Sequence, residues 1–121
     1  MIVDDHAETR TLIRELVGHY VDEIRECTNG EEAASQCTEF RPDLVTMDLN
    51  MPLKGGLEAT RRILARNPAT RVIVITQFDS AEYRLAAAQA GACHFFSKNN
   101  LFALLSYVKR QAQLLAGSNV P

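Results

Sequence analysis

Five short apolar runs alternate with stretches of helical periodicity along the chain, and this alternation limits the possible folds more than any other feature. The runs that we expect to be strands are residues 1–3, 21–27 (the weakest), 44–47, 72–75 and 94–97. A helix is expected after each run, and these helices end near Gly18, Pro42, Asn67, Gly91 and residue 116. Strands that alternate with helices form parallel sheets with helices on both faces. The sequence therefore predicts an α/β domain with a doubly wound, five-stranded parallel sheet and five helices.

Apolar spacing and capping residues describe the helices in more detail. The inward face predicted for the first helix consists of Leu12, Ile13, Leu16, Val17 and Tyr20. Two pairs have the spacing of a capping box, and these are Thr28 with Glu31 and Asp79 with Glu82. Gly91 suits the position after a helix, and Asn99 or Asn100 suits the start of the last one.

Length and charge indicate one domain and exclude some functions. A chain of 121 residues with 46% apolar residues is long enough for one domain with its own core. We expect this domain to cover residues 1–116, and residues 117–121 to be a tail or the start of a linker. A formal net charge of −2 argues against a dominant nucleic-acid footprint, which needs a basic patch.

The cysteines and the apolar segments bear on the location of the chain. Cys27, Cys37 and Cys93 are odd in number and form no CxxC pair, so we expect small core or near-core residues without a disulfide or zinc site. The N-terminus lacks the basic region of a signal peptide, and no apolar run approaches the roughly 20 residues of a membrane span. These features predict a cytoplasmic protein that does not contact a membrane.

Polar side chains follow four of the five predicted strands. Asp4 and Asp5 follow the first strand, Asp48 the third, Thr76 the fourth and Lys98 the fifth. In open parallel sheets, ligands bind at the carboxyl ends of the strands near the point where the strand order reverses. These side chains therefore gather in one patch if the strands that carry them are neighbours.

The chemistry of such a patch suits a phosphoryl group. Three carboxylates repel one another, and a divalent cation such as Mg²⁺, which prefers oxygen ligands, removes the conflict. Lys98 supplies a positive charge, Thr76 supplies a hydroxyl donor, and a carboxylate can itself be the nucleophile that forms an aspartyl phosphate. Each residue alone has an ordinary explanation, such as helix capping by Asp5 or surface exposure of Lys98. Their common position at strand ends favours the functional interpretation.

Four blocks of the sequence resemble the signature blocks of the receiver domain of bacterial two-component response regulators. The blocks are "IVDDH", "TMDLNMP", "VIVIT" and "FFSK", and the resemblance covers essentially the whole chain. It implies a flavodoxin-like (CheY-like) fold with the strand order 2-1-3-4-5.

The resemblance also implies a role for each site residue. Asp48 becomes the phosphoacceptor, while Asp5, Asp48 and the backbone carbonyl of Asn50 hold Mg²⁺ or Mn²⁺, with an indirect contribution from Asp4. Thr76 and Lys98 contact the phosphoryl oxygens. Pro52 stiffens the loop that carries the carbonyl of Asn50.

A conformational switch and partners are implied in the same way. On phosphorylation, Thr76 moves toward the phosphoryl group and Phe95 swings inward, which changes the surface of the last helix, the fifth strand and the helix before it.

The resemblance also implies the partners of the chain. The phosphoryl donor is a sensor histidine kinase, a phosphotransfer protein or a small acyl phosphate. His6 and Arg10 on the first helix are expected to face the kinase. Homodimerisation is expected through the last two helices, for which Tyr107, Lys109 and Arg110 are the outward candidates.

Some residues depart from the common pattern of this family. Asn99 follows Lys98, so the cis-proline that many receivers carry there is not implied. Gln77 and Phe78 follow Thr76 where a small residue is usual, and their bulk is expected to hinder water and lengthen the phosphorylated lifetime. The first strand is also unusually short.

The block "DDH" and the lysine without a following proline look more like the NarL/FixJ-type regulators, which carry a LuxR-family DNA-binding domain. The 121 residues contain no such domain, so the chain is either a fragment or a stand-alone receiver. The resemblance implies that DNA is contacted only through an output domain, which controls transcription.

Two other functions on a similar fold are compatible with parts of the sequence. A small phosphatase of the haloacid-dehalogenase type also forms an aspartyl phosphate, but needs an acid where Asn50 stands. A nucleotide- or flavin-binding module needs a glycine- or hydroxyl-rich loop where Asp4 and Asp5 stand. We therefore expect a phosphorylation-dependent signalling domain that is not an enzyme beyond its own phosphorylation and dephosphorylation.

Overall fold

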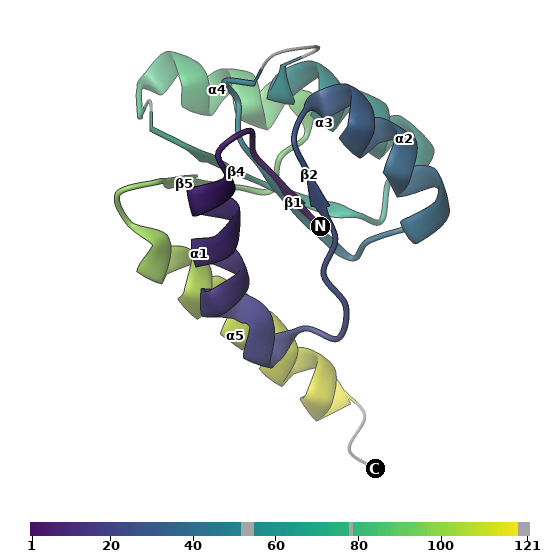
Figure 1. The fold of residues 1–121 in the computed structure, drawn as a ribbon, viewed down its shortest axis with the longest axis vertical. Helices are drawn as coiled ribbons and strands as arrows, with labels where there is room; N and C mark the ends of the chain where they lie inside the picture. The colour runs from purple at the N-terminus through teal and green to yellow at the C-terminus, as the bar shows by residue number, and fades with distance from the viewer. Residues whose placement is uncertain (52–54, 78, 119–121) are drawn as a thin grey trace.

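A computed structural model describes residues 1–51, 55–77 and 79–118, so Pro52 and Phe78 lie outside the described residues. The first half contains β1 (Ile2–Val3), α1 (Ala7–Val17), the 3₁₀ turn η1 (Gly18–Tyr20), β2 (Glu26–Cys27), α2 (Gly30–Phe40) and β3 (Leu44–Met47). The second half contains α3 (Gly56–Arg66), β4 (Arg71–Thr76), α4 (Ala81–Ala90), β5 (His94–Ser97) and α5 (Leu101–Ser118) (Figure 1). The strands form one parallel sheet in the order β2-β1-β3-β4-β5, which confirms the predicted fold class and strand order.

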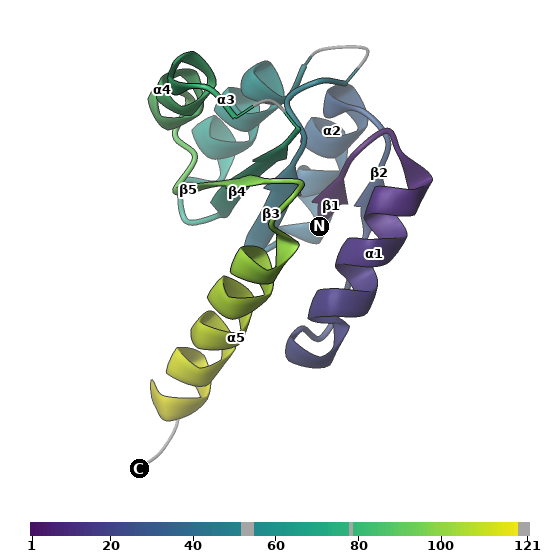
Figure 2. The ribbon, with the colours of Figure 1, turned by 90° about the vertical axis from the view of Figure 1, so that its left-hand side faces the viewer.

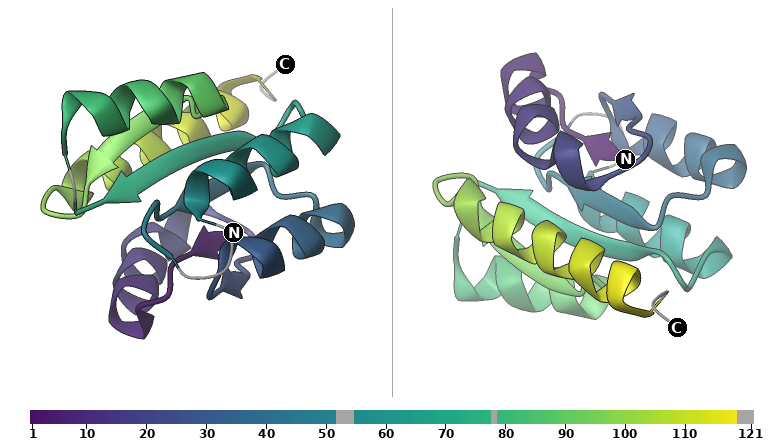
Figure 3. Two further views of the ribbon diagram at one scale, coloured as in Figure 1. Left: turned by 90° about the horizontal axis from the view of Figure 1, so that it is seen from above. Right: turned by 90° about the horizontal axis from the view of Figure 1, so that it is seen from below.

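Helices cover both faces of the sheet. In the two views of Figure 3, α4 lies nearer the viewer from above and α5 lies nearer from below. Helices α1 and α5 contact each other on one face and extend from the sheet in the same direction (Figure 2). Helices α2, α3 and α4 contact one another in sequence on the opposite face. This arrangement buries both faces of the central strands.

The alternation of side chains along β4 explains why its sequence is a continuous apolar run. Ile73 and Ile75 pack in a cluster with residues of α1 and α5, whereas Val72 and Val74 pack in clusters on the other face. Successive side chains of a strand point to opposite faces, so a strand covered on both sides needs apolar residues at every position. The same reasoning predicted β3 correctly at Leu44–Met47.

The helix starts differ from those expected from capping-box spacing. Asn29, not Thr28, caps α2, because its side chain accepts a hydrogen bond from the backbone N–H of Glu32 at 2.8 Å. Ser80, not Asp79, caps α4 by accepting from the N–H of Tyr83 at 3.2 Å. In both helices the observed cap lies one residue after the predicted one. Glu31 and Glu82, the predicted partners, therefore occupy the second and not the third helical position. Gly91 does follow α4 in the left-handed conformation, with φ of 104°, as predicted.

Some residues expected in the core are at the surface. Leu12 is exposed within α1, and Tyr20 is exposed in η1, where the chain has left the α-helix that ends at Val17. Cys93 is exposed as well, whereas Cys27 and Cys37 are buried as free thiols. The second strand pairs only over Glu26–Cys27, since its neighbour β1 is itself two residues long.

The C-terminal helix also departs from expectation in two respects. Helix α5 continues to Ser118, two residues into the segment expected to be a tail. Tyr107 does not point freely outward, because its ring lies 4.5 Å from the ring of His94 and is partly buried beside Phe96. Lys109 and Arg110 are exposed as expected. Among the described residues, none of the helices has the length and apolar character required to cross a membrane.

Candidate functional site

Backbone hydrogen bonds place the strand-end residues at one edge of the sheet. The N–H of Asp48 donates to the carbonyl of Val3 at 3.0 Å, which continues the pairing of β3 with β1 by one residue. The N–H of Lys98 similarly donates to the carbonyl of Thr76 at 2.8 Å. These bonds belong to the sheet ladder, so the sheet itself fixes where the side chains of Asp48 and Lys98 begin. The carboxyl ends of the neighbouring strands β1, β3, β4 and β5 therefore form the predicted patch.

The centre of this patch is a buried ion-pair cluster. The ammonium nitrogen of Lys98 lies 2.9 Å from Oδ2 of Asp4 and 3.2 Å from Oδ2 of Asp48. The residues Asp4 and Asp48 are only 2% and 3% exposed, so water solvates their charges poorly. One ammonium thus stands between two carboxylates, and the cluster keeps an excess of negative charge.

Protonation of the cluster reflects this imbalance. Burial raises the pKa of Asp48 above its ordinary value, and the charge of Asp4 raises it further against the opposing effect of Lys98. Burial alone would lower the pKa of Lys98, but its hydrogen bond to Asp4 and the charges of both carboxylates outweigh burial and raise it. Lys98 therefore stays charged at neutral pH, while ionised Asp48 is left in an unfavourable environment that an additional cation would relieve.

The loop after Asp48 holds its carboxylate from the other side. The N–H of Asn50 donates to Oδ1 of Asp48 at 3.3 Å, and the Asn50 side-chain amide lies 3.5 Å from Oγ1 of the fully buried Thr76. Gly56, the first residue of α3, packs so closely that a Cβ on it would overlap the backbone carbonyl of Asp48. The missing side chain of Gly56 therefore allows α3 to start directly against this loop.

The outer part of the patch is formed by the turn between β1 and α1. Nδ1 of His6 lies 3.0 Å from Oδ1 of Asp5 and 3.3 Å from Oδ1 of Asp4. Ligand atoms of Asp4, Asp5, His6 and Asp48 all lie within 4.8 Å of one another. The sequence prediction placed the three acids correctly but did not consider His6 as a possible ligand, although it directly follows Asp5.

Arg10 ties this turn to the edge of the sheet. Its guanidinium donates to the backbone carbonyl of Asp4 at 2.8 Å and, through Nε, to Glu26 of β2 at 3.0 Å. Arg14 adds a second bond to Glu26 at 2.8 Å. Burial opposes ionisation of Glu26, but the hydrogen bonds from Arg14 and Arg10 hold its pKa below the ordinary value. Arg10 therefore has a local structural role in positioning Asp4.

The remaining predicted residues lie around the patch. Gln77 is exposed beside Thr76, and Phe78 lies outside the described residues. Phe95 is partly buried against Leu49, Val74 and Ala87, with the guanidinium of Arg84 from α4 at 4.8 Å from the centre of its ring. The ring thus lies on the α4 face of the sheet and is covered by a cation.

The donor atoms present fit a divalent cation. Carboxylate and carbonyl oxygens suit Mg²⁺, and burial together with the charge of Asp4 raises the pKa of Asp48 in spite of the neighbouring Lys98, so a further cation would favour the ionised carboxylate. Asp4, Asp5 and Asp48 supply three carboxylates, and the imidazole of His6 is a donor that suits Mn²⁺ as well.

The chain belongs to a known family. Residues 1–109 match the family model described as response regulator receiver domain, so this chain is a receiver domain of a two-component response regulator. It is 34% identical over 99 residues to chemotaxis protein CheY of Thermotoga maritima, covering 81% of this chain and 82% of that protein. It is also 34% identical over 100 residues to the response regulator GacA of Pseudomonas viridiflava, covering 81% of this chain and 47% of that protein.

A solved structure agrees with both the sequence relationship and the fold. A two-component response regulator of the LuxR family from Aurantimonas sp. SI85-9A1 superposes with a TM-score of 0.76 at 30% identity, covering 100% of this chain and 96% of that one. This chain spans half or less of the length of several curated relatives, so what those whole proteins do is not transferred to it.

Proposed function

We propose that this receiver domain accepts a phosphoryl group on Asp48 and thereby changes the surface formed by α4, β5 and α5. The observation that carries the proposal is the position of Asp48, buried at the carboxyl end of β3 within 3.2 Å of the Lys98 ammonium. A carboxylate held beside a fixed cation is a competent nucleophile for phosphoryl transfer, because the charge that develops on the transferred oxygens is already compensated.

In the proposed reaction, an Oδ atom of Asp48 attacks the phosphorus atom of the donor. The bond between phosphorus and the donor breaks, and its electron pair leaves on the nitrogen of a phosphohistidine or the oxygen of an acyl phosphate. Lys98 then moves part of its contact from Asp48 to the new phosphoryl oxygens, and Thr76 donates its hydroxyl to one of them. A bound Mg²⁺ or Mn²⁺ would neutralise further charge on these oxygens.

The ligands proposed for the cation are Asp5, Asp48 and the backbone carbonyl of Asn50, with Asp4 acting indirectly. The positions support this division, because Asp4 already bonds Lys98 at 2.9 Å, while the Asp5 side chain is 29% exposed and contacts His6. In the following step, Thr76 and Phe95 transmit the new charge, and Phe95 must then leave its packing against Arg84 and α4. Access of water to the phosphoryl group is proposed to depend on Gln77 and Phe78.

The proposed donor is a sensor histidine kinase or phosphotransfer protein of the cytoplasm, docking near His6 and Arg10. The proposed consequence is homodimerisation and control of transcription through a DNA-binding output domain in a longer protein. The similarity to the LuxR-family regulator and to the transcriptional activator protein ExaE of Pseudomonas putida supports an output of that type. The reading frame beyond Pro121 tests this part, since a helix-turn-helix domain is expected there.

Incubation with acetyl phosphate and Mg²⁺, followed by intact-mass measurement, tests the acceptor. The wild-type chain should gain the mass of one phosphoryl group, and Asp48→Asn should gain none. Asp43→Asn is the matched control, because Asp43 is an exposed acid just before the opposite end of the same strand and should not affect labelling. Equal labelling of Asp48→Asn and wild type would refute the proposal.

A further inference from the structure

The side chain of Arg84 lies across the ring of Phe95 on the α4 face of the sheet. Its guanidinium carbon is 4.8 Å from the centre of the ring, a distance at which a cation is attracted to the face of an aromatic ring. The other neighbours of the ring are apolar, and Leu49, Val74 and Ala87 pack around it. Arg84 therefore contributes directly to holding Phe95 where the structure places it.

Arg84 is itself held in place by Asp79. Nε of Arg84 donates to Oδ1 of Asp79 at 2.6 Å, and Nη2 donates to Oδ2 at 3.0 Å. Two parallel bonds of this kind fix the plane of a guanidinium as well as its position. The two side chains are 51% and 44% exposed, so the pair by itself contributes little to stability. Its main effect is to orient the cation over the ring.

Asp79 and Phe95 belong to the two segments that move in the proposed switch. Asp79 follows Thr76 by three residues and lies just before α4. Phe95 lies on β5, two residues before Ser97, which pairs with Thr76 of β4. Helix α4 and strand β5 contact each other, and Figure 2 shows them together at the left of the molecule. Arg84 therefore connects the segment after Thr76 to the ring of Phe95.

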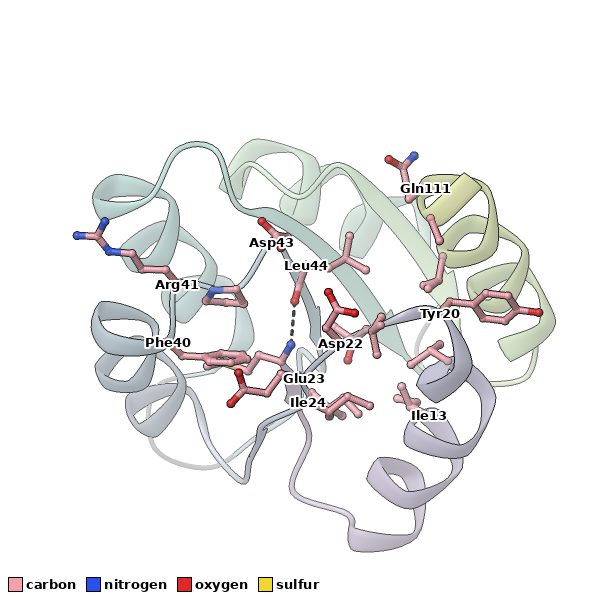
Figure 4. Close-up of a pocket in the computed structure, with 18 residues that line it drawn as sticks. Ile13, Tyr20, Asp22, Glu23, Ile24, Phe40, Arg41, Asp43, Leu44 and Gln111 are labelled. Carbon is pink, nitrogen blue, oxygen red and sulfur yellow. Dashed lines mark hydrogen bonds between the residues drawn. The ribbon is translucent and has the colours of Figure 1, made fainter. Parts of the chain in front are cut away.

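A cation over a ring does not by itself indicate a switch. Arg25 covers the ring of Phe40 at 4.5 Å and lies 3.8 Å from Glu23. Phe40 and Glu23 line a pocket at the end of the sheet where β3 begins (Figure 4). This second cluster has the same types of side chain but is remote from Thr76. Arg84 differs in its two parallel bonds to an acid that closely follows Thr76 in the chain.

We propose that Asp79 and Arg84 form a clasp that holds the ring of Phe95 in its unphosphorylated position and so opposes the switch. Arg84 is a positioning residue, because it acts through Phe95. Movement of Thr76 toward a phosphoryl group displaces the segment that carries Asp79 and draws the guanidinium off the ring. The free energy of the clasp is thereby subtracted from the affinity of the site for a phosphoryl group. The inference rests on the proposed function of Asp48.

Beryllofluoride, a mimic of the phosphoryl group that binds together with Mg²⁺, measures the effect on affinity. Arg84→Met removes the cation and its two bonds but keeps an aliphatic side chain. It should bind beryllofluoride about two- to fivefold more tightly than wild type, the change expected from one cation–ring contact at an exposed site. Arg25→Met removes the corresponding cation from Phe40 and is the matched control, because Arg25 is also about half exposed. Its affinity should equal that of wild type.

Fluorine NMR reports on the ring itself in the absence of beryllofluoride. The five phenylalanines are labelled with 4-fluorophenylalanine, and the resonance of Phe95 is assigned by its absence from Phe95→Leu. In Arg84→Met, this resonance should move toward the position that it takes in wild type with beryllofluoride. Asp79→Asn should give a smaller move in the same direction, because Arg84 keeps its charge but loses its fixed orientation. Arg25→Met should leave the resonance unchanged.

The two measurements distinguish failure of this inference from failure of the proposed function. A wild-type chain that does not bind beryllofluoride would overturn the proposed function and the clasp with it. Binding by wild type, with equal or weaker binding by Arg84→Met, would overturn the clasp alone. The clasp would also be overturned if the Phe95 resonance moved equally in Arg84→Met and Arg25→Met, or moved away from its position with beryllofluoride.

Discussion

The Nζ atom of Lys98 lies 3.2 Å from Oδ2 of Asp48, across the gap between the ends of β5 and β3. Because the same ammonium lies 2.9 Å from Asp4, the unphosphorylated site holds two buried carboxylates with one fixed cation. This imbalance would favour the binding of further positive charge, and it leads to measurable effects on stability.

Replacing Asp48 by Asn should stabilise the protein at neutral pH. Burial and the charge of Asp4 raise the pKa of Asp48 in the folded state, so the unfolded chain loses this proton at a lower pH than the folded one. Stability therefore decreases as pH rises from the unfolded value, about 4, through the folded value, and the cost persists above it. Asp48→Asn removes this cost, while Lys98 keeps its bond to Asp4.

Urea unfolding from pH 3 to pH 8 measures this effect. The advantage of Asp48→Asn over wild type should be present at pH 7, vanish below about pH 4 and shrink when Mg²⁺ is added. Asp43→Asn, an exposed acid, should show no comparable gain. A lower stability of Asp48→Asn than of wild type at pH 7 would contradict the charge imbalance described here.

Replacing Lys98 by Met should destabilise the protein by about 3 kcal/mol, because it leaves two buried carboxylates without their cation. Lys109→Met on the exposed part of α5 is the matched control and should change the free energy of unfolding by less than about 0.5 kcal/mol. Adding Asp48→Asn to Lys98→Met should restore part of the loss. If the two lysine variants were equally stable, the ion pairs would contribute nothing to the fold.

Gly56→Ala should destabilise the protein by about 2 kcal/mol and reduce labelling of Asp48. The new Cβ would overlap the carbonyl of Asp48, so either α3 or the loop must move. Gly18→Ala offers a control, since its Cβ would meet no atom within 4 Å and its backbone is already right-handed, with φ of −57°. Thermal unfolding of both variants checks the difference; equal Tm values would show that the loop adapts freely.

Thr46→Val should stabilise the protein by about 1 kcal/mol. Within the described part of the chain, Oγ1 of Thr46 is buried and makes no hydrogen bond, so its removal leaves nothing unpaired. Thr70→Val should instead cost about 1 kcal/mol, because the Thr70 hydroxyl donates to the carbonyl of Pro42 at 3.0 Å. Chemical denaturation measures both changes, and a loss of stability in Thr46→Val would indicate a partner for its hydroxyl.

The parts of the site that follow from topology were predictable from the sequence. Asp48 and Lys98 each follow an apolar run, and in a parallel sheet all such positions fall on one edge. The resemblance of the four sequence blocks to the receiver family then implied the strand order, which periodicity alone did not provide.

Features that depend on the geometry of a single residue were not predictable. The helix starts illustrate this, because each helix begins one residue later than the capping-box spacing predicted. Asn29 therefore caps α2. Asp79 is not a cap and instead pairs with Arg84 at 2.6 Å. The contact of His6 with Asp5 depends on how the chain turns into α1, for which the sequence carries no periodic signal. The strand β2 is only two residues long because it pairs with β1, which has two residues, and a strand forms hydrogen bonds only along the length of its neighbour.

The central claim, that Asp48 accepts the phosphoryl group, is tested most directly by locating the modified residue. Borohydride reduces an aspartyl phosphate to homoserine, so the acetyl-phosphate-treated protein can be reduced, digested and analysed by tandem mass spectrometry. We predict homoserine at position 48, dependent on Mg²⁺ and absent from untreated protein. Homoserine at Asp4 or Asp5, or phosphorylation that survives unchanged in Asp48→Asn, would contradict the account.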